Sequence, residues 1–424
     1  MVRGTPEKFL KALFERAVHA ASADETLSAH LPPPPKGRTL MIALGKAAAA
    51  MARVALAHRP DIARGVILIP YGHGDPALDP PPGIDLIEAR HPIPDARGVQ
   101  AAQAALRLAR ELGEGDQLLA LISGGGSSLL TLPGEGLSLA QKKAVTRQLL
   151  DSGADIREIN AVRARLSAIK GGRLAAAASP ARVVTLVISD VPGDDPAFVA
   201  SGPTVSMSGP VADAADILKK YNIDFPVEAL PPARASRQGP ANHKTMVIAT
   251  GDMALAAAAD HARAEGVARV LNLGAGVTGD AATLGRQHGE LALGEANRLR
   301  QTRQKRPRLI LSGGETSVTL GAGPRGVGGR NTEYLLSLAM ALRGRGGIYA
   351  LACDTDGIDG AEQNAGAIIT PDTVARAGAL GLNPAASLNR HDAYPFFRRL
   401  DDLIITGPTR TNVNDFRAIL ILPE

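Results

Sequence analysis

The sequence has little of several residue types, and each shortage excludes a class of protein. It holds one cysteine, Cys353, so an intramolecular disulfide and a cage of thiolate metal ligands are both excluded, and a reducing, cytoplasmic compartment is expected. Aromatic residues make up 3% of the chain and tryptophan is absent, which argues against base-stacking platforms for nucleic acids. No apolar run approaches the roughly 18 residues that span a bilayer. We therefore expect neither a nucleic acid nor a membrane as a partner.

Charge and length are those of an ordinary globular protein. Lys and Arg number 47 against 42 Asp and Glu, a net charge of +5 that mildly favours anionic ligands such as metabolite phosphates. Hydrophobic residues make up 45% and charged residues 21%, so the chain as a whole is neither fibrous nor disordered. Its 424 residues suggest two or three domains. The charged, helix-like N-terminus lacks the apolar core of a signal peptide.

The order of apolar segments predicts an α/β fold. Short runs rich in Val, Ile and Leu alternate with Ala-rich segments of helical periodicity, the pattern of parallel sheets covered by helices. A Pro-rich and basic segment at 230–244 marks a boundary, so we place a larger domain at residues 1–235 and a smaller one at 236–424. The expected strands are 39–44, 65–70, 85–89, 116–123 and 182–190 in the first domain, and 244–251, 268–274, 307–314, 347–354 and 416–422 in the second.

Glycines and serines follow the fourth expected strand. Three glycines let backbone N–H groups approach an anion closely, the serines add hydroxyl donors, and the next segment would aim a helix N-terminus at a phosphate. A plain flexible turn is the alternative. Because ligands of open α/β sheets bind beyond the carboxyl ends of strands, we interpret the turn as a phosphate or carboxylate cradle. Its residues are Ser123, Gly124, Gly125, Gly126, Ser127 and Ser128.

A similar turn occurs in the second domain. Ser312, Gly313 and Gly314 end an expected strand, and Glu315 follows them. A carboxylate at this place suits a divalent cation or a basic side chain held against phosphates. A surface or capping role for Glu315 is an equal alternative.

Two further segments combine charge with glycine. The loop 323–333 contains Arg325 and Arg330, whose guanidinium groups suit a carboxylate or a phosphate, with a solvated loop as the alternative. The segment 353–360 carries several acids but misses the spacing of a calcium loop. Its carboxylates, Asp354 and Asp356 among them, fit better as groups that bind magnesium or orient a hydroxyl.

Three isolated residues are weaker candidates. Lys46 follows the first expected strand and would neutralise a phosphate there, although a lone lysine is usually solvated. Asp190 ends a strand, where it either holds a metal or forms a turn. His91 precedes a proline and is more often structural than a base.

Two strings match the dinucleotide pattern G-x-G-x-x-G. The string 274–279 lies between an expected strand and an expected helix, but the ribose-binding acid expected about 20 residues later falls in a basic helical segment. The string 321–326 contains Pro324 and has no acid at this distance. An NAD(P)H-dependent reductase is therefore the weaker alternative.

Several longer motifs occur together and in order. They are ALGKAA, RHPIPD, LISGGGSSLL, EINAVRARLSAIKGGRLA, VISDVPGDDPAFVASGPTV, LSGGETSVTL, GRNTEYLL, DTDGIDG and TNVNDF, from about Lys46 to the C-terminus. This set resembles the glycerate 2-kinases of the MOFRL type. The resemblance implies ATP-dependent phosphorylation of D-glycerate to 2-phosphoglycerate with Mg²⁺. It also implies a cleft between a Rossmann-like N-terminal domain and a smaller C-terminal domain. Some members carry the name hydroxypyruvate reductase.

The resemblance further implies which residues act. The matching positions are Lys46, Glu315, Arg330, Asp356 and Asn412. The Ser123–Ser128 turn, Lys170 and Arg173 would line the same cleft. Three choices stay open, namely Asp354 or Asp356, Asn412 or Asn414, and Arg325 or Arg330.

Phosphoryl transfer needs positioning and charge more than covalent help, and this requirement suggests a role for each residue. Lys46 and Arg330 would clamp a phosphate or the glycerate carboxylate, and Asp356 would orient or deprotonate the 2-hydroxyl. Glu315 and Asp190 would help to hold Mg²⁺, while Asn412 would position the substrate. A homodimer is expected only because symmetric dimers are the usual assembly.

Overall fold

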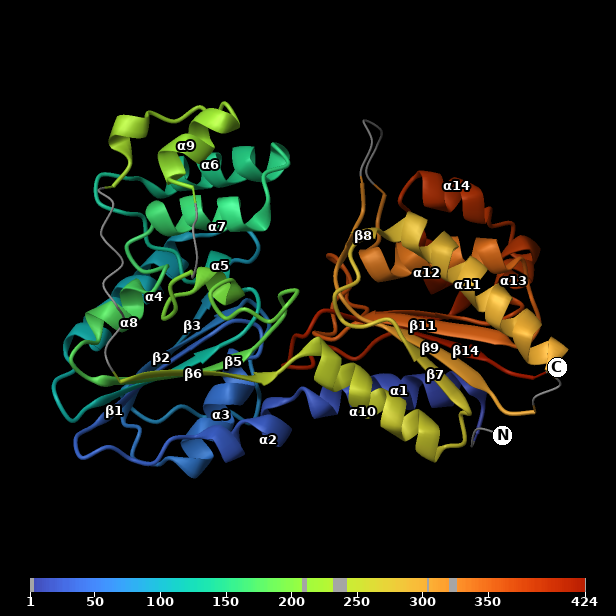
Figure 1. Cartoon of the computed structure of the whole chain (residues 1–424), viewed down its shortest axis with the longest axis horizontal. Helices are drawn as coiled ribbons and strands as arrows, with labels where there is room; N and C mark the ends of the chain where they lie inside the picture. The colour runs from blue at the N-terminus through green and yellow to red at the C-terminus, as the bar shows by residue number, and fades with distance from the viewer. Residues whose placement is uncertain (1–3, 208–211, 232–241, 303–304, 320–325, 424) are drawn as a thin grey trace. The chain divides into compact units, whose positions relative to one another are not determined.

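The computed structural model describes residues 4–207, 212–231, 242–302, 305–319 and 326–423. The chain forms two compact units (Figure 1). We call Ala23–Ile248 the first unit, and Met1–Ser22 together with Ala249–Glu424 the second unit. The boundary at 235/236 lies outside the described residues. The division between the units falls later, because strand β6 (His243–Ala249), which we expected to begin the second domain, instead pairs at the edge of the first sheet.

The N-terminal helix α1 (Pro6–Ala20) also differs from the expected division, since it belongs to the second unit. Thr5 caps its N-terminus, and one face buries Phe9, Leu10, Leu13, Phe14 and Ala17. This face packs on helix α10 (Gly251–Ala264) and on strands β11 (Ile348–Asp354) and β14 (Asp415–Ile421). An amphipathic pattern specifies that a helix must cover something, but it does not specify which sheet.

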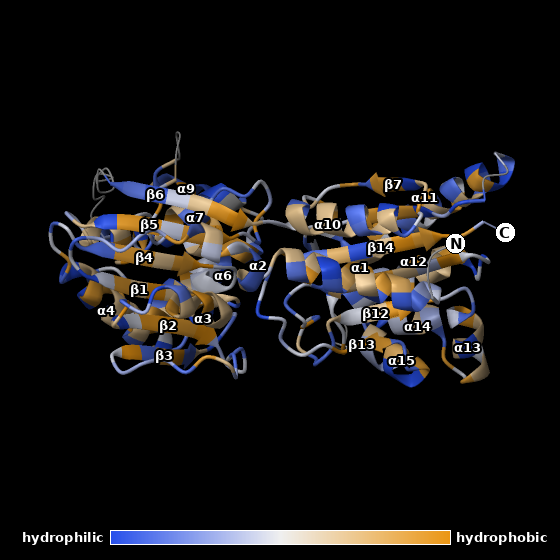
Figure 2. Ribbon diagram, turned by 90° about the horizontal axis from the view of Figure 1, so that it is seen from below, coloured by the Kyte–Doolittle hydropathy of each residue, from blue (hydrophilic) through white to orange (hydrophobic). Residues whose placement is uncertain are grey.

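The first unit is built on a six-stranded sheet of order β3-β2-β1-β4-β5-β6, the order of a doubly wound fold. The five strands from β1 to β5 pair in parallel. Their bounds are β1 (Thr39–Leu44), β2 (Arg64–Pro70), β3 (Ile84–Ala89), β4 (Gln117–Ile122) and β5 (Arg182–Ile188). Each lies within two residues of its predicted position. Figure 2 shows β1, β2 and β4 as apolar along their length, as parallel strands covered on both faces must be.

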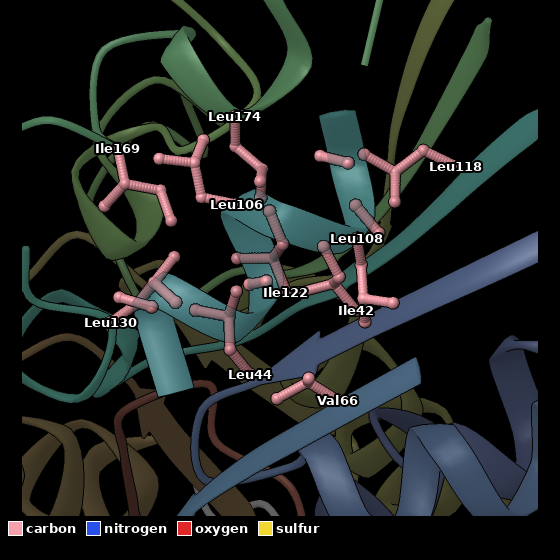
Figure 3. Packing of buried hydrophobic residues seen from close by; sticks show 14 of the residues in the cluster. Ile42, Leu44, Val66, Leu106, Leu108, Leu118, Ile122, Leu130, Ile169 and Leu174 are labelled. Carbon is pink, nitrogen blue, oxygen red and sulfur yellow. The ribbon is translucent and has the colours of Figure 1, made fainter. Parts of the chain in front are cut away.

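Helices cover both faces of this sheet. Alternate side chains such as Ile42 and Leu44 pack against Leu106, Leu108 and Leu174 on one face (Figure 3). The helices of this face are α4 (Ala96–Arg110), α5 (Gly126–Leu129) and α8 (Arg173–Ala177), while α2 (Ala23–Thr26) and α3 (Ala48–His58) lie toward the other. A separate small core joins α6 (Leu139–Asp151), α7 (Ile156–Arg165) and α9 (Ala214–Lys220). None of the helices in the described residues is both long and apolar enough to cross a membrane.

The second unit contains a six-stranded sheet of order β13-β12-β11-β14-β9-β7. Only the β7–β9 pair is parallel among its pairings, so this sheet departs from the parallel pattern that we expected. A run of apolar residues indicates that a strand is buried on both faces. It does not indicate whether the strand runs parallel or antiparallel to its neighbours. The remaining strands are β7 (Arg269–Asn272), β8 (Gly279–Asp280), β9 (Arg308–Ser312), β10 (Thr316–Ser317), β12 (Gly366–Ile369) and β13 (Leu403–Ile404), of which β8 and β10 pair separately.

Helices α1 and α10 cover one face of the second sheet, and a larger group covers the other (Figure 1). That group comprises α11 (Ala281–Gln301), α12 (Arg330–Leu342), α13 (Thr373–Ala379), α14 (Pro384–Asn389) and α15 (Ala393–Leu400). Its core includes Tyr334, Phe396 and Phe397. The N-terminus of α12 carries Arg330, so the packing of this layer positions a predicted site residue.

A buried histidine in this layer predicts a loss of stability in mild acid. His288 Nδ1 lies 2.9 Å from Tyr334 Oη, and burial together with the nearby Arg417 charge lowers the pKa of His288 from its usual 6.5 to about 4. Between pH 6.5 and 4, therefore, only the unfolded chain takes up this proton. We expect folding to lose about 3 kcal/mol across this window, relative to a His288→Gln variant that does not titrate. Urea unfolding at pH 7 and pH 4.5 measures the difference, and a pH-independent difference would contradict the prediction.

Candidate functional site

In the first unit, one group of candidate residues lies where the order of the sheet reverses, between β1 and β4. In doubly wound sheets the crevice beyond the carboxyl ends of these two strands binds the ligand. Lys46 follows β1 and the Ser123–Ser128 turn follows β4. The backbone N–H of Lys46 donates to the Gly124 carbonyl (2.9 Å), and Ser123 Oγ accepts from the N–H of Ala47 (3.0 Å). Two candidates from separate parts of the sequence therefore lie together at the switch point.

Glycine is required on both sides of this contact. Gly45 has a φ of +114°, and a Cβ there would lie 2.3 Å from Ser123 Oγ. Gly125 has a φ of +79°, and a Cβ there would lie 3.2 Å from Lys46 Cγ and 3.3 Å from His91 Nε2. The Lys46 stem and the imidazole of His91 thus approach the backbone of the turn, which places His91 closer to the site than sequence reasoning did.

The helix after the turn is shorter than expected. Helix α5 comprises only four residues, Gly126–Leu129, so it has no macrodipole of useful size to aim at a phosphate. What the turn offers to an anion is therefore local: backbone N–H groups, hydroxyls and neighbouring cations.

Lys170 lies beneath the turn and holds it in place. It is 2% exposed, and its Nζ donates to the carbonyl oxygen of Ser127 (2.6 Å), to Ser127 Oγ (3.0 Å) and to the carbonyl of Ala200 (3.2 Å). Burial, followed by the charges of Lys142 and Arg163, lowers the pKa of Lys170 well below its usual value. Since its Nζ already contacts three acceptors of the protein, Lys170 shapes the turn from below.

The predicted metal pair is divided between the units. Asp190 lies just after β5 in the first unit, whereas Glu315 belongs to the second. Within the described residues, no group of three or more His, Cys, Asp and Glu side chains is placed to hold a metal ion. A cation at either acid would therefore need ligands from elsewhere, as Mg²⁺ commonly takes from phosphates and water.

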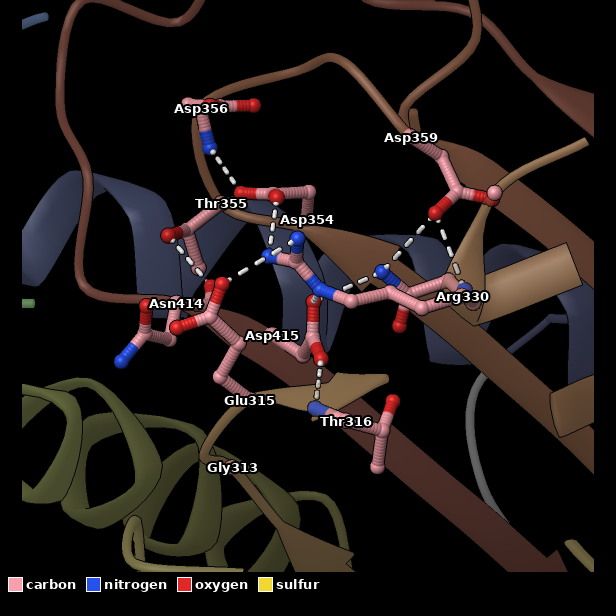
Figure 4. A network of polar contacts seen from close by, with 12 residues as sticks. Gly313, Glu315, Thr316, Arg330, Asp354, Thr355, Asp356, Asp359, Asn414 and Asp415 are labelled. Carbon is pink, nitrogen blue, oxygen red and sulfur yellow. Dashed lines mark hydrogen bonds and ion pairs between the residues drawn. The ribbon is translucent and has the colours of Figure 1, made fainter. Parts of the chain in front are cut away.

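In the second unit, another group of candidate residues centres on Arg330, the first residue of α12 (Figure 4). Its Nε lies 2.8 Å from Asp415 Oδ1, its Nη2 2.6 Å from Asp354 Oδ2, and its Nη1 3.5 Å from Glu315 Oε1. Burial opposes the charged form, but these three carboxylates raise the pKa of Arg330 well above its usual value. Asp354 and Asp415 are buried, while the Glu315 side chain is 55% exposed. The guanidinium is thus already bound on two sides and turns its third side toward an exposed acid.

Asp415 is the residue that sequence reasoning missed. Besides Arg330 it accepts from Asn331 Nδ2 (2.7 Å) and pairs with Arg417, and both arginines are therefore held by one buried carboxylate. Arg417 Nη1 in turn donates to the Gly313 carbonyl (2.8 Å). A signal was present in the sequence, because two charged residues, two positions apart in an otherwise apolar strand, must share one face.

The three acids of the 353–360 segment have different partners. Asp354 Oδ1 accepts from the N–H of Asp356 (3.0 Å), in addition to its pairing with Arg330. Asp356 Oδ1 accepts from the N–H of Ile358 (2.8 Å). Asp359 accepts from the N–H groups of Asn331 and Thr332, both at 2.9 Å, and so caps α12. Asp354 and Asp359 therefore both support the position of Arg330, and Asp356 lies beside them.

Asn412 and Asn414 shape the neighbouring segment. Asn412 Oδ1 accepts from the N–H of Asn414 (3.2 Å), and the Asn414 carbonyl accepts from Thr355 Oγ1 (2.6 Å). Asn414 has a φ of +68°, a conformation that asparagine tolerates better than most residues. Both residues thus lie next to the acidic segment. Of the two arginines in the 323–333 loop, Arg325 lies outside the described residues.

The second glycine turn, Ser312–Gly314, forms its contacts with other parts of the second unit. Gly314 has a φ of +94°, and a Cβ there would lie 2.2 Å from the Val277 carbonyl oxygen. The Gly314 carbonyl accepts from the N–H of Asp415 (3.0 Å), and the N–H of Gly313, the residue after Ser312, donates to Gly274 (2.9 Å). This turn uses its backbone groups to join β9 to its neighbours.

The same contacts bear on the dinucleotide string 274–279. The N–H of Gly274 donates to Asn272 Oδ1 (2.9 Å), and the N–H of Ala275 donates to Asp252 Oδ1 (3.0 Å). Two of the backbone N–H groups that this string would offer to a pyrophosphate are thus bound to side chains of the protein.

Comparison with known proteins gives a consistent result over the whole chain. Residues 9–235 match a family model described as a domain of unknown function, DUF4147, and residues 308–415 match the MOFRL family. A protein of Thermotoga maritima named D-glycerate 2-kinase is 36% identical over 423 residues, which cover 98% of this chain and 99% of that protein. A protein of Agrobacterium vitis with the provisional name hydroxypyruvate reductase is 46% identical over 417 residues, 97% of this chain and 94% of its own.

A solved structure agrees with the two-unit α/β architecture. The crystal structure of glycerate kinase from Thermotoga maritima superposes with a TM-score of 0.84 at 34% sequence identity, covering 98% of this chain and 99% of that chain. The agreement therefore extends over both units.

Proposed function

The chain belongs to the family of glycerate kinases that join a DUF4147 domain to a MOFRL domain, and from this membership we propose that it transfers the γ-phosphoryl group of ATP to the 2-hydroxyl of D-glycerate. The products are 2-phosphoglycerate and ADP. One observation carries the choice of site: Lys46 and the glycine turn meet at the switch point of the first sheet, where such sheets bind ligands.

The first unit would bind phosphate groups. The Lys46 ammonium and the N–H groups of the turn offer positive charge and directed donors to the oxygens of the phosphoryl group being transferred. His91, beside Gly125, adds a third donor or acceptor at the same place. These contacts favour the transition state because its charge spreads over the same oxygens.

The second unit would act on the acceptor alcohol. The 2-hydroxyl oxygen forms a bond to the γ-phosphorus, the bond from this phosphorus to the bridging oxygen breaks, and ADP leaves with that electron pair. The hydroxyl proton passes to a carboxylate. We assign this role to Asp356, because Asp354 is committed to the Arg330 ion pair, and we assign Asn412 to positioning.

Arg330 takes a narrower role than that of a free anion clamp. Its Nε and Nη2 hold the buried carboxylates of Asp415 and Asp354, which leaves the Nη1 edge, 3.5 Å from Glu315, for a substrate carboxylate. The buried acids hold the guanidinium in one orientation, and this orientation is what a substrate would recognise.

Mg²⁺ fits the exposed oxygen ligands of the proposed site. This ion commonly takes one or two carboxylates together with phosphate oxygens and water. In the second unit the carboxylate toward it would be Glu315, whose side chain is 55% exposed, and in the first unit the carboxylate offered to such an ion would be Asp190. When bound, the ion neutralises charge on the β- and γ-phosphates.

A variant of Asp356 tests the proposal together with its regiochemistry. Wild-type protein incubated with ATP, Mg²⁺ and D-glycerate should give 2-phosphoglycerate, identified by phosphorus NMR. Asp356→Asn should lower kcat by about 100-fold or more, since a positioned general base contributes about that much. The control is Asp260→Asn, on the exposed surface of α10, which should keep wild-type turnover. Wild-type turnover in Asp356→Asn would contradict the assignment.

The same assay addresses the reductase alternative. A parallel reaction with hydroxypyruvate and NADH or NADPH should leave the nicotinamide absorbance unchanged. Consumption of NAD(P)H without any phosphorylated product would instead favour the name carried by the Agrobacterium vitis relative. The occupied N–H groups at Gly274 and Ala275 argue for the first outcome.

A further inference from the structure

Two segments of the second unit separate at the end of the β11–β14 pair, and each carries a residue of the proposed acceptor site. The antiparallel register of the two strands ends where Asp354 lies opposite Asp415. The chain that leaves β11 there leads to Asp356, the proposed base, and the chain that enters β14 comes from Asn412, the proposed positioning residue. The distance between the base and the amide therefore depends on the contacts that join the two segments beyond the last pair of the ladder.

Thr355 supplies these contacts with its backbone and its side chain (Figure 4). Its N–H donates to the Asn414 carbonyl (3.0 Å). Its hydroxyl donates to the same oxygen (2.6 Å) and accepts from the N–H of Val413 (2.9 Å). Thr355 is 1% exposed and Val413 is 2% exposed, so these hydrogen bonds are shielded from water. Because the hydroxyl acts both as a donor and as an acceptor, a valine of the same shape cannot replace it.

The backbone conformation of Asn414 depends on the same contacts. Its φ of +68° lies in the left-handed region, which costs free energy for a residue with a side chain. Two hydrogen bonds from Thr355 to the Asn414 carbonyl offset this cost. Loss of the hydroxyl removes one of them, together with the bond to Val413, so the segment can then relax toward an ordinary backbone conformation.

The segment that precedes β14 is fixed at its other end. Thr411 is fully buried, and its Oγ1 donates to the carbonyl of Ala21, the residue that ends α1 (2.6 Å). The N–H of Thr409 donates to the Asp356 carbonyl (3.0 Å), and Thr409 Oγ1 donates to the Thr355 carbonyl (2.5 Å). None of these bonds uses the hydroxyl of Thr355. Its loss would therefore shift the three residues before β14 while these anchors stay in place.

We propose that Thr355 is a positioning residue that determines which hydroxyl of the acceptor is phosphorylated, an inference that rests on the proposed function. Its hydroxyl is bound to backbone groups of the protein, so it acts through Asn412 and Asp356. The carbons that carry the two hydroxyls of glycerate are adjacent, about 1.5 Å apart. A substrate displaced by about that length presents its 3-hydroxyl to Asp356 in place of its 2-hydroxyl.

The displaced reaction uses the same chemistry. The 3-hydroxyl oxygen forms the bond to the γ-phosphorus, the bond from this phosphorus to the bridging oxygen breaks, and ADP leaves with that electron pair. The hydroxyl proton passes to Asp356, and the product is 3-phosphoglycerate. A misplacement of about 1 Å can lower the rate of a positioned reaction by about 100-fold. A small shift of Asn412 is therefore enough to change which product dominates.

The products of Thr355→Val, formed from D-glycerate, ATP and Mg²⁺ and identified by phosphorus NMR, test the proposal. We expect kcat for 2-phosphoglycerate to fall about 10-fold or more, and the ratio of 3- to 2-phosphoglycerate to rise by a similar factor. The KM for ATP should stay unchanged, because the proposed phosphate contacts belong to the first unit. The ratio of the two products does not depend on the fraction of enzyme that is folded, so a loss of stability alone cannot change it.

Two further variants of Thr355 separate the hydroxyl from the shape of the side chain. Thr355→Ser keeps the hydroxyl and should give the wild-type product ratio. Thr355→Ala removes the hydroxyl without placing a methyl group against the Asn414 carbonyl, so it should change the ratio as Thr355→Val does, even where the valine variant folds poorly.

Thr373→Val is the matched control. Thr373 is fully buried at the start of α13, and its hydroxyl accepts from the N–H of Thr370 (2.9 Å). Strand β12 ends with Ile369 opposite Ala350, which places this turn at the end of β11 away from Asp354. The control should therefore lose some stability and keep the wild-type product ratio.

The possible results are distinct. A wild-type ratio in Thr355→Val and Thr355→Ala, including the case in which no protein forms 3-phosphoglycerate, would overturn the proposal and leave the proposed function intact. An equal change of the ratio in Thr373→Val would also overturn it, because any loss of packing would then have the same effect. Wild-type protein that forms neither phosphoglycerate would overturn the proposed function and this proposal with it.

Discussion

Replacing Arg330 by methionine is expected to cost about 3–5 kcal/mol of unfolding free energy at pH 8 and to abolish turnover. Arg330 is the cation that faces Asp354 and shares Asp415 with Arg417, and both acids are buried. Removing one member of a buried ion pair leaves the other charged and desolvated, which is far more costly than losing an exposed pair. Urea unfolding followed by circular dichroism measures the stability, and the phosphorus NMR assay measures the turnover.

Two control variants sharpen this prediction. Arg330→Lys keeps the charge but cannot reach three carboxylates at once, so it should recover part of the stability and little of the turnover. Arg286→Met, on the exposed face of α11, should change stability by less than about 0.5 kcal/mol. The loss in Arg330→Met should also shrink at pH 5, because a buried carboxylate without a cation takes up a proton. If Arg330→Met is as stable as Arg286→Met at pH 8, the network does not hold α12 in place.

Alanine at Gly314 is expected to destabilise the second unit by about 3 kcal/mol or more. The new Cβ would lie 2.2 Å from the Val277 carbonyl oxygen and 2.5 Å from its nitrogen, and a φ of +94° is strained for any residue with a side chain. Both neighbours are backbone atoms, so relief requires the 275–277 segment or the end of β9 to move. Because Gly314 accepts from the N–H of Asp415, this movement would also disturb the carboxylate that holds Arg330.

The same segment offers a matched control. A Cβ on Gly276 would have no atom within 4 Å, so Gly276→Ala should be neutral or slightly stabilising. Thermal unfolding of Gly314→Ala and Gly276→Ala compares the effect of adding one methyl group at a crowded position with its effect at an open position. Equal melting temperatures for the two variants would contradict the packing role of Gly314.

Hydrophobic and glycine patterns within short segments predict the parts of this protein that depend on contacts between residues close in the sequence. The run 39–44 is a strand because six consecutive buried apolar residues suit the centre of a covered sheet, and β1 has these bounds. Lys46 and the Ser123–Ser128 turn could be proposed together because both follow central strands, and parallel strands bring their carboxyl ends to one edge. These predictions need no knowledge of distant contacts.

The missed features depend on contacts between distant positions. Asp415 lies 85 positions from Arg330, and its role follows from the antiparallel pairing of β14 with β11, a direction that apolar patterns do not encode. Lys170 was expected to line a site, yet it lies beneath the turn, where three acceptors surround its ammonium group. The hydrophobic pattern of a segment predicts which of its residues must be buried. Which other residues they pack against depends on the whole fold.

The position of α1 sets an order of events during synthesis. This helix is made before the first unit, yet α10, β11 and β14, which cover its apolar face, emerge only after the whole of Ala23–Ile248. About 400 residues separate the end of α1 from the end of β14, so at the usual 5–20 residues per second the delay is on the order of 20 to 80 s. The first unit is continuous in the chain and can close while translation proceeds. The second unit cannot close before β14 (Asp415–Ile421) has been made, because α1 packs on that strand. Docking of α1 is therefore delayed until β14 has emerged, and until then one face of the second sheet is open to chaperones and to other nascent chains.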